Sequence, residues 1–251
     1  MLEIKNLSVK YGNKSILEQV SFSVSPGQWL MIIGPNGSGK STTVNAISGG
    51  IDYTGTISLD EKNLRDFKKK DLAAQIGILL QNHNVGYGFS VEEIVRLGRY
   101  AHKPSLFASG KDDSEEIVQR ALELTGMDKI RKQSVLTLSG GELQRTFLAQ
   151  LLTQDPQIMI LDEPTNHLDL VYQKQVFELI EKWRKETNRT VISVVHDLSL
   201  ARIFGTHGVM INKGKVVAFG KIEDVVKPEL INPIYSMDVY DWMRNLYGQW
   251  K

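Results

Sequence analysis

Apolar and polar residues alternate along the first 25 residues of the chain. The runs LEIKNLSVKY (2–11) and ILEQVSFSVS (16–25) both follow a two-residue period, and the dipeptides GN and PG come after them. A period of two is typical of strands with one buried face, and these dipeptides favour turns. The pattern therefore predicts antiparallel strands at the beginning of the chain.

Further along, fully apolar runs replace this alternation. Short apolar runs followed by segments of helical periodicity favour buried strands joined to helices, as in a parallel sheet. The strand and helix pairs predicted in this way are 29–33 with 40–49, 158–161 with 172–186, and 190–195 with 198–205. Further strands are predicted at 54–60 and 76–81, and a hairpin with a Lys-Gly turn at 208–220.

Residues from about 82 to 155 have helical periodicity and few strand signals, with helices expected at 91–100, 112–126 and 142–152. The pattern predicts an α/β core that a helical insertion interrupts. The expected parts are a core with an N-terminal antiparallel β subdomain (1–81 and 156–226), a helical subdomain (82–155) and a C-terminal extension (227–251). The extension is rich in Tyr and Trp, and packing in the core explains these aromatics better than partner binding, although we assign the segment no role.

Composition narrows the classes of protein that the chain can belong to. Its 251 residues suit one large domain, and a net charge of +1 gives no electrostatic reason to expect nucleic-acid binding. The absence of cysteine excludes disulfides, thiolate catalysis and thiolate metal sites. The apolar runs are far shorter than the roughly 20 residues that span a bilayer, and the first residues lack a signal-peptide pattern. We therefore expect a cytoplasmic protein that reaches a membrane only through another chain.

The segment GPNGSGKS (34–41) has the spacing of a phosphate-binding loop. Its glycines allow the loop to curl, so that backbone N–H groups point at phosphate oxygens. Lys40 adds a charge for the β and γ phosphates, and Ser41 offers a hydroxyl to Mg²⁺. A chance glycine-rich turn is the alternative, but this segment follows an apolar strand and opens a helix, which is the context that the chemistry needs.

Polar residues follow three other predicted strands. Because ligands bind at the carboxyl ends of parallel strands, we expect Asp162 to hold Mg²⁺ through water and Glu163 to orient or deprotonate the attacking water. His196 is placed to hydrogen-bond the γ-phosphate, although a lone histidine is more often structural. Gln81 could ligate Mg²⁺ or the water. Tyr11 could stack on adenine, or be an ordinary tyrosine at a strand end.

The segment LSGGELQR (138–145) raises the question of a second anion site. Gly140 and Gly141 lie between Ser139 and a helical run, and glycine is costly inside a helix, so the pair belongs at the helix start. A helix that opens with bare amides and a hydroxyl can hold an anion. The phosphate loop of this chain lies about a hundred residues earlier, which leaves the source of that anion open.

Together these motifs resemble those of an ATP-binding-cassette ATPase. Tyr11, GPNGSGKS, Gln81, LSGGE, ILDEP, Asp169 and His196 occur in the order and spacing of that family, and the resemblance extends from Met1 to about Val226. It implies an α/β P-loop NTPase (RecA-like) fold and the ligands ATP and Mg²⁺. It also implies a nucleotide-binding set in the phosphate loop: Gly34, Pro35, Asn36, Gly37, Ser38, Gly39, Lys40, Ser41 and Thr42.

The resemblance further implies a head-to-tail dimer that encloses two ATP molecules. Ser139, Gly140 and Gly141, together with Glu142, would then contact the γ-phosphate held by the second copy, and Asp169 would help to seal the interface. Such reciprocal contacts suit a two-fold interface, where each patch meets the other. By the same resemblance, ATP would close the dimer, Glu163 would activate water, and Lys40, Mg²⁺ and His196 would offset the developing charge.

Three segments are similar to those of importer ATPases for ferric siderophores, haem or cobalamin: 91–106, 196–226 and 228–239. In that group an integral-membrane permease docks on the ATPase, so residues 82–94 are expected to form the dock. Charged replacements of Phe89 and Val91 are expected to abolish docking without unfolding the protein. A substrate-binding protein would select the cargo, and the permease would hold the chain at the inner face of the membrane.

Two other classes stay open. DEPTNHLD (162–169) also resembles soluble tandem cassettes that act on ribosomes, but this chain has one cassette and no basic arm. An exporter or lipid-extraction ATPase shares every catalytic motif. The cargo itself cannot be read from the sequence, because in such importers the ATPase has no pocket for it.

Overall fold

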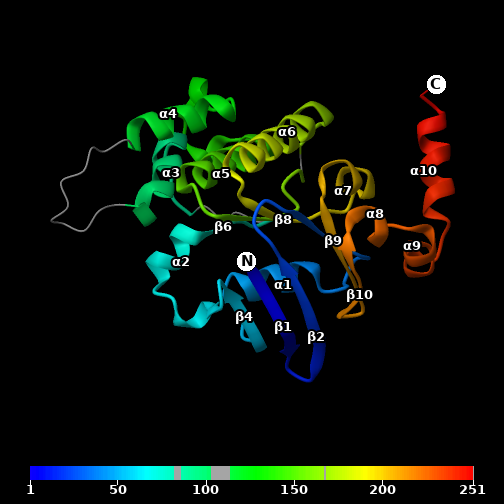
Figure 1. Cartoon of the computed structure of the whole chain (residues 1–251). Coiled ribbons are helices and arrows are strands. Elements are labelled where there is room, and N and C mark those ends of the chain that lie inside the picture. Colours follow the sequence, from blue (N-terminus) through cyan, green and yellow to red (C-terminus); the bar gives the residue numbers. More distant parts are fainter. Residues whose placement is uncertain (82–85, 103–113, 167, 251) are drawn as a thin grey trace. The chain divides into compact units, whose positions relative to one another are not determined.

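A computed structural model describes residues 1–81, 86–102, 114–166 and 168–250 (Figure 1). Contacts between residues divide the chain into two units, Met1–Leu64 with Ile192–Lys251 (unit 1) and Arg65–Val191 (unit 2). Each unit is described by itself. This division follows contacts rather than subdomain boundaries, so the boundaries expected from the sequence stay a prediction.

Unit 1 contains an antiparallel sheet with the strand order β2-β1-β4-β5. Its strands are β1 (Leu2–Tyr11), β2 (Lys14–Val24), β4 (Thr54–Leu59) and β5 (Lys62–Asn63). β1 pairs with β2 from Leu2 opposite Val24 to Tyr11 opposite Lys14. Buried residues such as Leu2, Ile4 and Val9 recur along β1, so the alternating pattern correctly predicted half-buried antiparallel strands.

A second group of strands in unit 1 supports the phosphate loop. Strand β3 (Trp29–Ile33) is entirely buried and runs parallel to β9 (His207–Asn212). β9 pairs antiparallel with β10 (Lys215–Lys221). The two residues between them, Lys213 and Gly214, have φ values of 47° and 76°, as a two-residue hairpin turn with both residues left-handed requires. The predicted hairpin is confirmed.

Five helices complete unit 1: α1 (Lys40–Ile47), α7 (Leu198–Phe204), α8 (Ile222–Val225), α9 (Pro228–Tyr235) and α10 (Val239–Gly248). Asp197 caps α7 and Asp238 caps α10, because their carboxylates accept hydrogen bonds from the first backbone amides. The last two helices form the C-terminal extension (Figure 1). The expectation that its aromatics pack in the core is wrong for Trp242 and Trp250, which are 53% and 90% exposed.

Unit 2 holds the parallel pair β6 (Ile76–Leu79) and β7 (Ile158–Asp162) and the long helix α6 (Leu170–Thr187). The buried strand β8 (Thr190–Val194) contains the boundary between the units. Helix α2 (Lys69–Gln75) was not predicted. None of its residues is buried, so it has no apolar periodicity from which a helix could be inferred.

The helical part of unit 2 is built from α3 (Val91–Leu97), α4 (Ser114–Leu124) and α5 (Gly140–Gln154), which pack on one another. An ion-pair network joins α3 to α4 and to Arg131, which lies between α4 and α5: Glu92 accepts from Arg96 at 2.7 Å and from Arg131 at 2.8 Å, and Arg96 also contacts Glu115. The predicted helical segment is confirmed within the described residues. In those residues, no helix has both the length and the hydropathy needed to cross a bilayer.

Candidate functional site

The loop between β3 and α1 curls because its glycines adopt conformations that other residues avoid. Gly34, Gly37 and Gly39 have φ values of 146°, 74° and 109°. A Cβ atom on Gly34 would lie 2.0 Å from the Ile211 carbonyl oxygen, and one on Gly39 would lie 2.5 Å from Leu17 Cδ2. Glycine is therefore required at both ends of the loop by backbone conformation and by close approach.

Lys40 lies inside this curl and is only 5% exposed. Its Nζ donates hydrogen bonds to the carbonyl oxygens of Gly34, at 2.8 Å, and Pro35, at 3.0 Å. The ammonium group is thus held by the loop itself, in a buried position where its charge is poorly screened.

Two features of the same loop suit an anion. The N-cap of α1 is Gly39, which has no side chain to bond the first amides of the helix. The hydroxyl of Ser38 is buried and has no hydrogen-bond partner among the described residues. Such an unpaired group costs about 1–3 kcal/mol. A phosphate oxygen would satisfy these donors, so this geometry supports the predicted phosphate-binding loop, which stays a prediction.

Two candidate carboxylates of unit 2, Asp162 and Glu163, lie at the end of β7. Asp162 ends the strand and is 4% exposed. Glu163 has a left-handed backbone, with a φ of 53°, which is uncommon for a residue with a side chain. Its Oε2 accepts hydrogen bonds from the side-chain amides of Gln81, at 2.8 Å, and Asn166. The structure therefore brings Gln81 and Glu163 together, as their positions at two strand ends suggested.

Asn166 is a residue whose role the sequence reasoning missed. It lies in the NHLD segment, of which only Asp169 was singled out. Its short side chain reaches Glu163 because the chain turns between them, with the Asn166 N–H bonded to the Glu163 carbonyl at 3.2 Å. His167, in the same segment, lies outside the described residues.

The LSGG segment begins α5 as the glycine pair predicted. Ser139 is the N-cap, and its Oγ accepts a hydrogen bond from the Glu142 N–H. The Glu142 carboxylate in turn accepts from the Ser139 N–H and hydroxyl, both at 2.8 Å. These bonds, the backbone one first, lower the pKa of Glu142. Ser139 and Gly140 are exposed, so the helix start is accessible.

The remaining candidates lie apart in the chain and are each accessible. Tyr11 ends β1 and is 53% exposed. His196 follows β8 and is exposed. Asp169 caps α6, with its Oδ1 accepting from the Tyr172 N–H at 3.0 Å, so it has a structural role besides the one expected from the family.

A contact from the C-terminal extension to the phosphate loop was not foreseen. The hydroxyl of Tyr235, at the end of α9, meets the backbone N–H of Gly34. Burial raises the pKa of Tyr235, and the Gly34 N–H offsets this in part. The segment 228–239 resembles importer ATPases, but its sequence does not indicate which element Tyr235 contacts.

The predicted permease dock needs a correction. Residues 82–85 lie outside the described residues. Val91 is completely buried, so a charge there would disrupt the packing of α3, and the expectation that such a variant folds normally is wrong. Phe89 is 44% exposed and Tyr87 is 74% exposed, with their ring centroids 6.1 Å apart. These two aromatics are the accessible part of the segment.

Comparison with known proteins places this chemistry in context. A family model described as ABC transporter matches residues 17–166. The chain is 38% identical over 239 residues to the uncharacterized ABC transporter ATP-binding protein YvrA of Bacillus subtilis (strain 168); the match covers 95% of this chain but only 54% of that relative, about half of its length.

Two other relatives have names that state a cargo. The chain is 37% identical to the ferric enterobactin transport ATP-binding protein FepC of Escherichia coli (strain K12), over 93% of this chain and 86% of that protein. It is 33% identical to the hemin import ATP-binding protein HmuV of Pseudomonas aeruginosa (strain PAO1), over 95% and 94%. Among solved structures, the dimeric post-hydrolysis state of the ATP-binding cassette MJ0796 bound to ADP and Pi is 27% identical with a TM-score of 0.77, over 88% of this chain and 99% of that one.

Proposed function

Because this chain belongs to the ABC transporter family, whose ATP-binding subunits are ATPases, we propose that it drives an importer of iron siderophores, haem or cobalamin. The observation that carries the ATPase half of the proposal is the buried ammonium of Lys40 inside the glycine curl. The siderophore and haem part of the cargo proposal is supported by the names of relatives that match nearly the whole chain, and cobalamin rests on the sequence resemblance alone.

ATP is the nucleotide that this loop is proposed to bind. Lys40 would exchange its two loop carbonyls for phosphate oxygens, since charge-assisted bonds to phosphate are stronger than bonds to neutral carbonyls. Ser38 would gain the partner that it lacks. Tyr11, with its exposed ring, would stack on the adenine. The loop residues from Gly34 to Thr42 stay the proposed nucleotide-binding set.

Mg²⁺ is proposed to accompany the nucleotide. Ser41, Asp162 and Gln81 offer a hydroxyl, a carboxylate and an amide oxygen, which are the hard donors that this ion prefers. The described residues contain no cluster of three or more histidines and carboxylates. The three donors of Ser41, Asp162 and Gln81 fit an ion whose other ligands are waters and phosphate oxygens. Bound there, Mg²⁺ would neutralise charge on the phosphates.

Glu163 is proposed to be the general base for water. The Gln81 and Asn166 amides donate to its Oε2 and fix the direction of the carboxylate. His196 is proposed to hydrogen-bond the γ-phosphate.

Assembly as a dimer is proposed for the working state, by analogy with the dimeric MJ0796 cassette. The exposed start of α5, with Ser139, Gly140 and Gly141, would meet the γ-phosphate held by the second copy. The capping box with Glu142 keeps the Ser139 hydroxyl in place for that contact. Asp169 would lie at the same interface.

The permease is proposed to dock on unit 2. Besides Phe89 and Tyr87, a cavity of about 380 Å³ is lined by Lys69 of α2, by Leu97 at the end of α3, by Tyr100 after it, and by residues of α5. Leu97 and Tyr100 are 54% and 69% exposed. Exposed apolar side chains beside a hollow are typical of a protein-binding surface, and a short permease helix would suit it.

The dock is tested by copurification of this chain with its permease. We expect Phe89→Glu to remove the complex and Val217→Glu to preserve it. Val217 is a matched control, because it is 43% exposed and lies on β10 of unit 1. A complex that survives Phe89→Glu at wild-type yield would place the dock elsewhere.

Import is tested in cells from which the gene has been deleted. We expect loss of uptake of one labelled cargo among ferric siderophore, haem and cobalamin, restored by the wild-type chain and not by Glu163→Gln. Normal uptake of all three in the deletion strain would contradict the proposed cargo class. Copurification with ribosomes, without a membrane partner, would favour the soluble alternative.

A further inference from the structure

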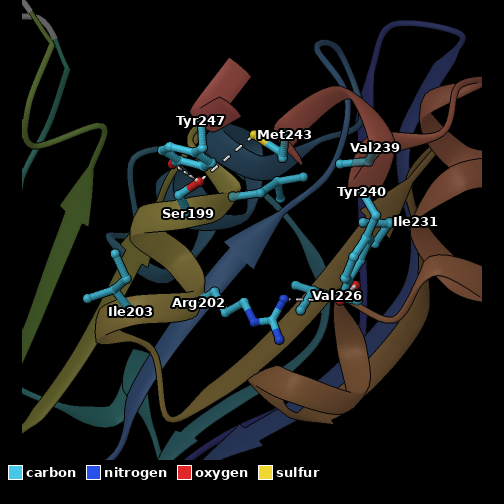
Figure 2. A pocket seen from close by; sticks show the side chains of 10 residues that line it. Ser199, Arg202, Ile203, Val226, Ile231, Val239, Tyr240, Met243 and Tyr247 are labelled. Carbon is cyan, nitrogen blue, oxygen red and sulfur yellow. Dashed lines mark hydrogen bonds between the residues drawn. The ribbon is translucent and has the colours of Figure 1, made fainter. Parts of the chain in front are cut away.

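The C-terminal extension forms a pocket that no part of the ATPase mechanism uses. A cavity of about 440 Å³ opens between α7, the segment after α8, α9 and α10, all within unit 1. Its volume lies in the range of roughly 300–1,000 Å³ that is usual for small-molecule sites. Figure 2 shows the labelled side chains of α7, α9 and α10 gathered around it.

The floor of the pocket is apolar. Leu198 of α7, Val226 after α8, Ile231 of α9 and Val239 and Met243 of α10 line it. Val226, Ile231 and Val239 are at most 5% exposed, so this floor is a fixed part of the packing of unit 1. An apolar ligand group of matching size would gain roughly 25 cal/mol for each Å² of apolar surface that it removes from water.

Two sets of side-chain hydrogen bonds border this floor. At one end, Arg202 donates to the Tyr240 hydroxyl at 3.3 Å, and Tyr240 donates to the Val226 carbonyl at 3.2 Å. At the other end, the Tyr247 hydroxyl donates to Ser199 Oγ at 2.7 Å. Figure 2 shows these bonds as dashed lines, together with a longer one of 3.9 Å from Ser199 Oγ to the Met243 sulfur. Apart from that contact with the floor, the polar groups lie at the two ends of the pocket.

The charge at the rim of the pocket is positive and comes from Arg202. Arg202 is the sole charged residue among those lining the pocket, and it forms no ion pair with a carboxylate in the described part of the chain. The nearby acids are engaged elsewhere: Asp224 pairs with Lys227 at 2.7 Å, and Asp197 and Asp238 cap helices. With one bond spent on Tyr240, the guanidinium keeps four further N–H donors, enough for a bidentate carboxylate.

We propose that this pocket binds a small amphipathic carboxylate, with its apolar part on the floor and its carboxylate on Arg202. The Tyr247 and Ser199 hydroxyls at the far end accommodate a polar substituent on the ligand. An ammonium ligand would meet Arg202 with like charge, and a neutral alcohol would lose the charge-assisted bonds. The site thus discriminates by charge as well as by apolar area.

The test uses octanoate, octanol and octylammonium as probes of equal chain length on the full wild-type chain. Calorimetric titration should give saturable binding of octanoate that is about 10-fold or more tighter than that of octanol, because a charge-assisted hydrogen bond contributes about 1.5–3 kcal/mol. Octylammonium should bind more weakly still. The ¹³C-methyl resonance of Met243, which lines the floor, should shift with octanoate at the same midpoint.

Two arginine variants locate the site. Arg202→Gln should weaken octanoate binding about 10-fold and leave octanol unchanged, and Arg244→Gln should change neither. Arg244 is the matched control, since it lies on α10, is exposed and does not line the pocket. Equal affinity for the three probes in the wild-type chain, or an unchanged affinity in Arg202→Gln, would show a nonspecific apolar surface and overturn the proposal. ATP binding is not part of either readout, so failure here leaves the proposed ATPase function intact.

Discussion

Replacing Glu163 by glutamine removes the proposed base while preserving most of its surroundings. Glutamine keeps a carbonyl oxygen, which can accept from both Gln81 and Asn166, so the local geometry survives. A hydrogen bond to a charged acceptor contributes about 1.5–3 kcal/mol and one to a neutral acceptor about 0.5–1.5 kcal/mol. The two bonds together weaken by at most about 2–3 kcal/mol, and by less here because Glu163 is partly exposed.

The expected effect on catalysis is larger than the effect on folding. Loss of a general base lowers turnover by at least ~10², which corresponds to about 2.7 kcal/mol in the activation barrier. ATP should still bind, because the phosphate loop is untouched, and the ATP-bound dimer should accumulate since hydrolysis no longer separates it. Phosphate release measured at saturating ATP gives the rate, and analytical ultracentrifugation with ATP gives the dimer.

A matched variant separates this effect from the loss of any surface charge. Glu178→Gln removes an exposed carboxylate of α6 whose partner is Lys174, at 3.7 Å. We expect it to hydrolyse ATP at the wild-type rate. If Glu163→Gln also hydrolysed ATP at a near-normal rate, the carboxylate would not be the base, and its bonds to Gln81 and Asn166 would have only a structural meaning.

Two further predictions follow from charged groups. Lys40→Ala should weaken ATP binding by about 10-fold or more, since it removes charge-assisted bonds to phosphate; unchanged affinity in a calorimetric titration would refute the phosphate-loop assignment. Hydrogen bonds from Arg131, then Arg96, lower the pKa of Glu92 from 4.5 to about 2. Because the folded pKa lies below the unfolded one, this stability is complete above about pH 4.5 and disappears as the pH falls towards 2. Glu92→Gln should lower the free energy of unfolding by roughly 1–2 kcal/mol at pH 7, which is less than the full pKa shift implies because the side chains are partly exposed. At pH 2 the same substitution should change it little. Urea unfolding at both pH values measures the two effects.

Periodicity predicted the strands and long helices because burial imposes it. β1 and β3 were expected from two-residue alternation and from a fully apolar run, and both are confirmed. The glycine pair at 140–141 was placed at a helix start from the cost of glycine inside helices, and α5 begins there. α2 was missed since a helix without buried residues leaves no periodic trace.

The candidate residues were found from motifs, but their partners were not. The bond of Lys40 to its own loop carbonyls and the bond of Asn166 to Glu163 depend on turns whose shape no motif states. The burial of Val91 was likewise hidden, because a valine after a capping serine fits both an exposed loop and a core position. Sequence motifs therefore supplied the candidate residues, and the fold determined which of their atoms meet.

Burial raises the pKa of Tyr235 and the Gly34 amide offsets this in part, so the end of α9 lies against the first glycine of the proposed phosphate loop. A truncation that removes α9 would therefore change the surroundings of Gly34, about two hundred residues earlier in the chain. Nucleotide affinities measured on chains truncated before α9 would thus differ from those of the full chain.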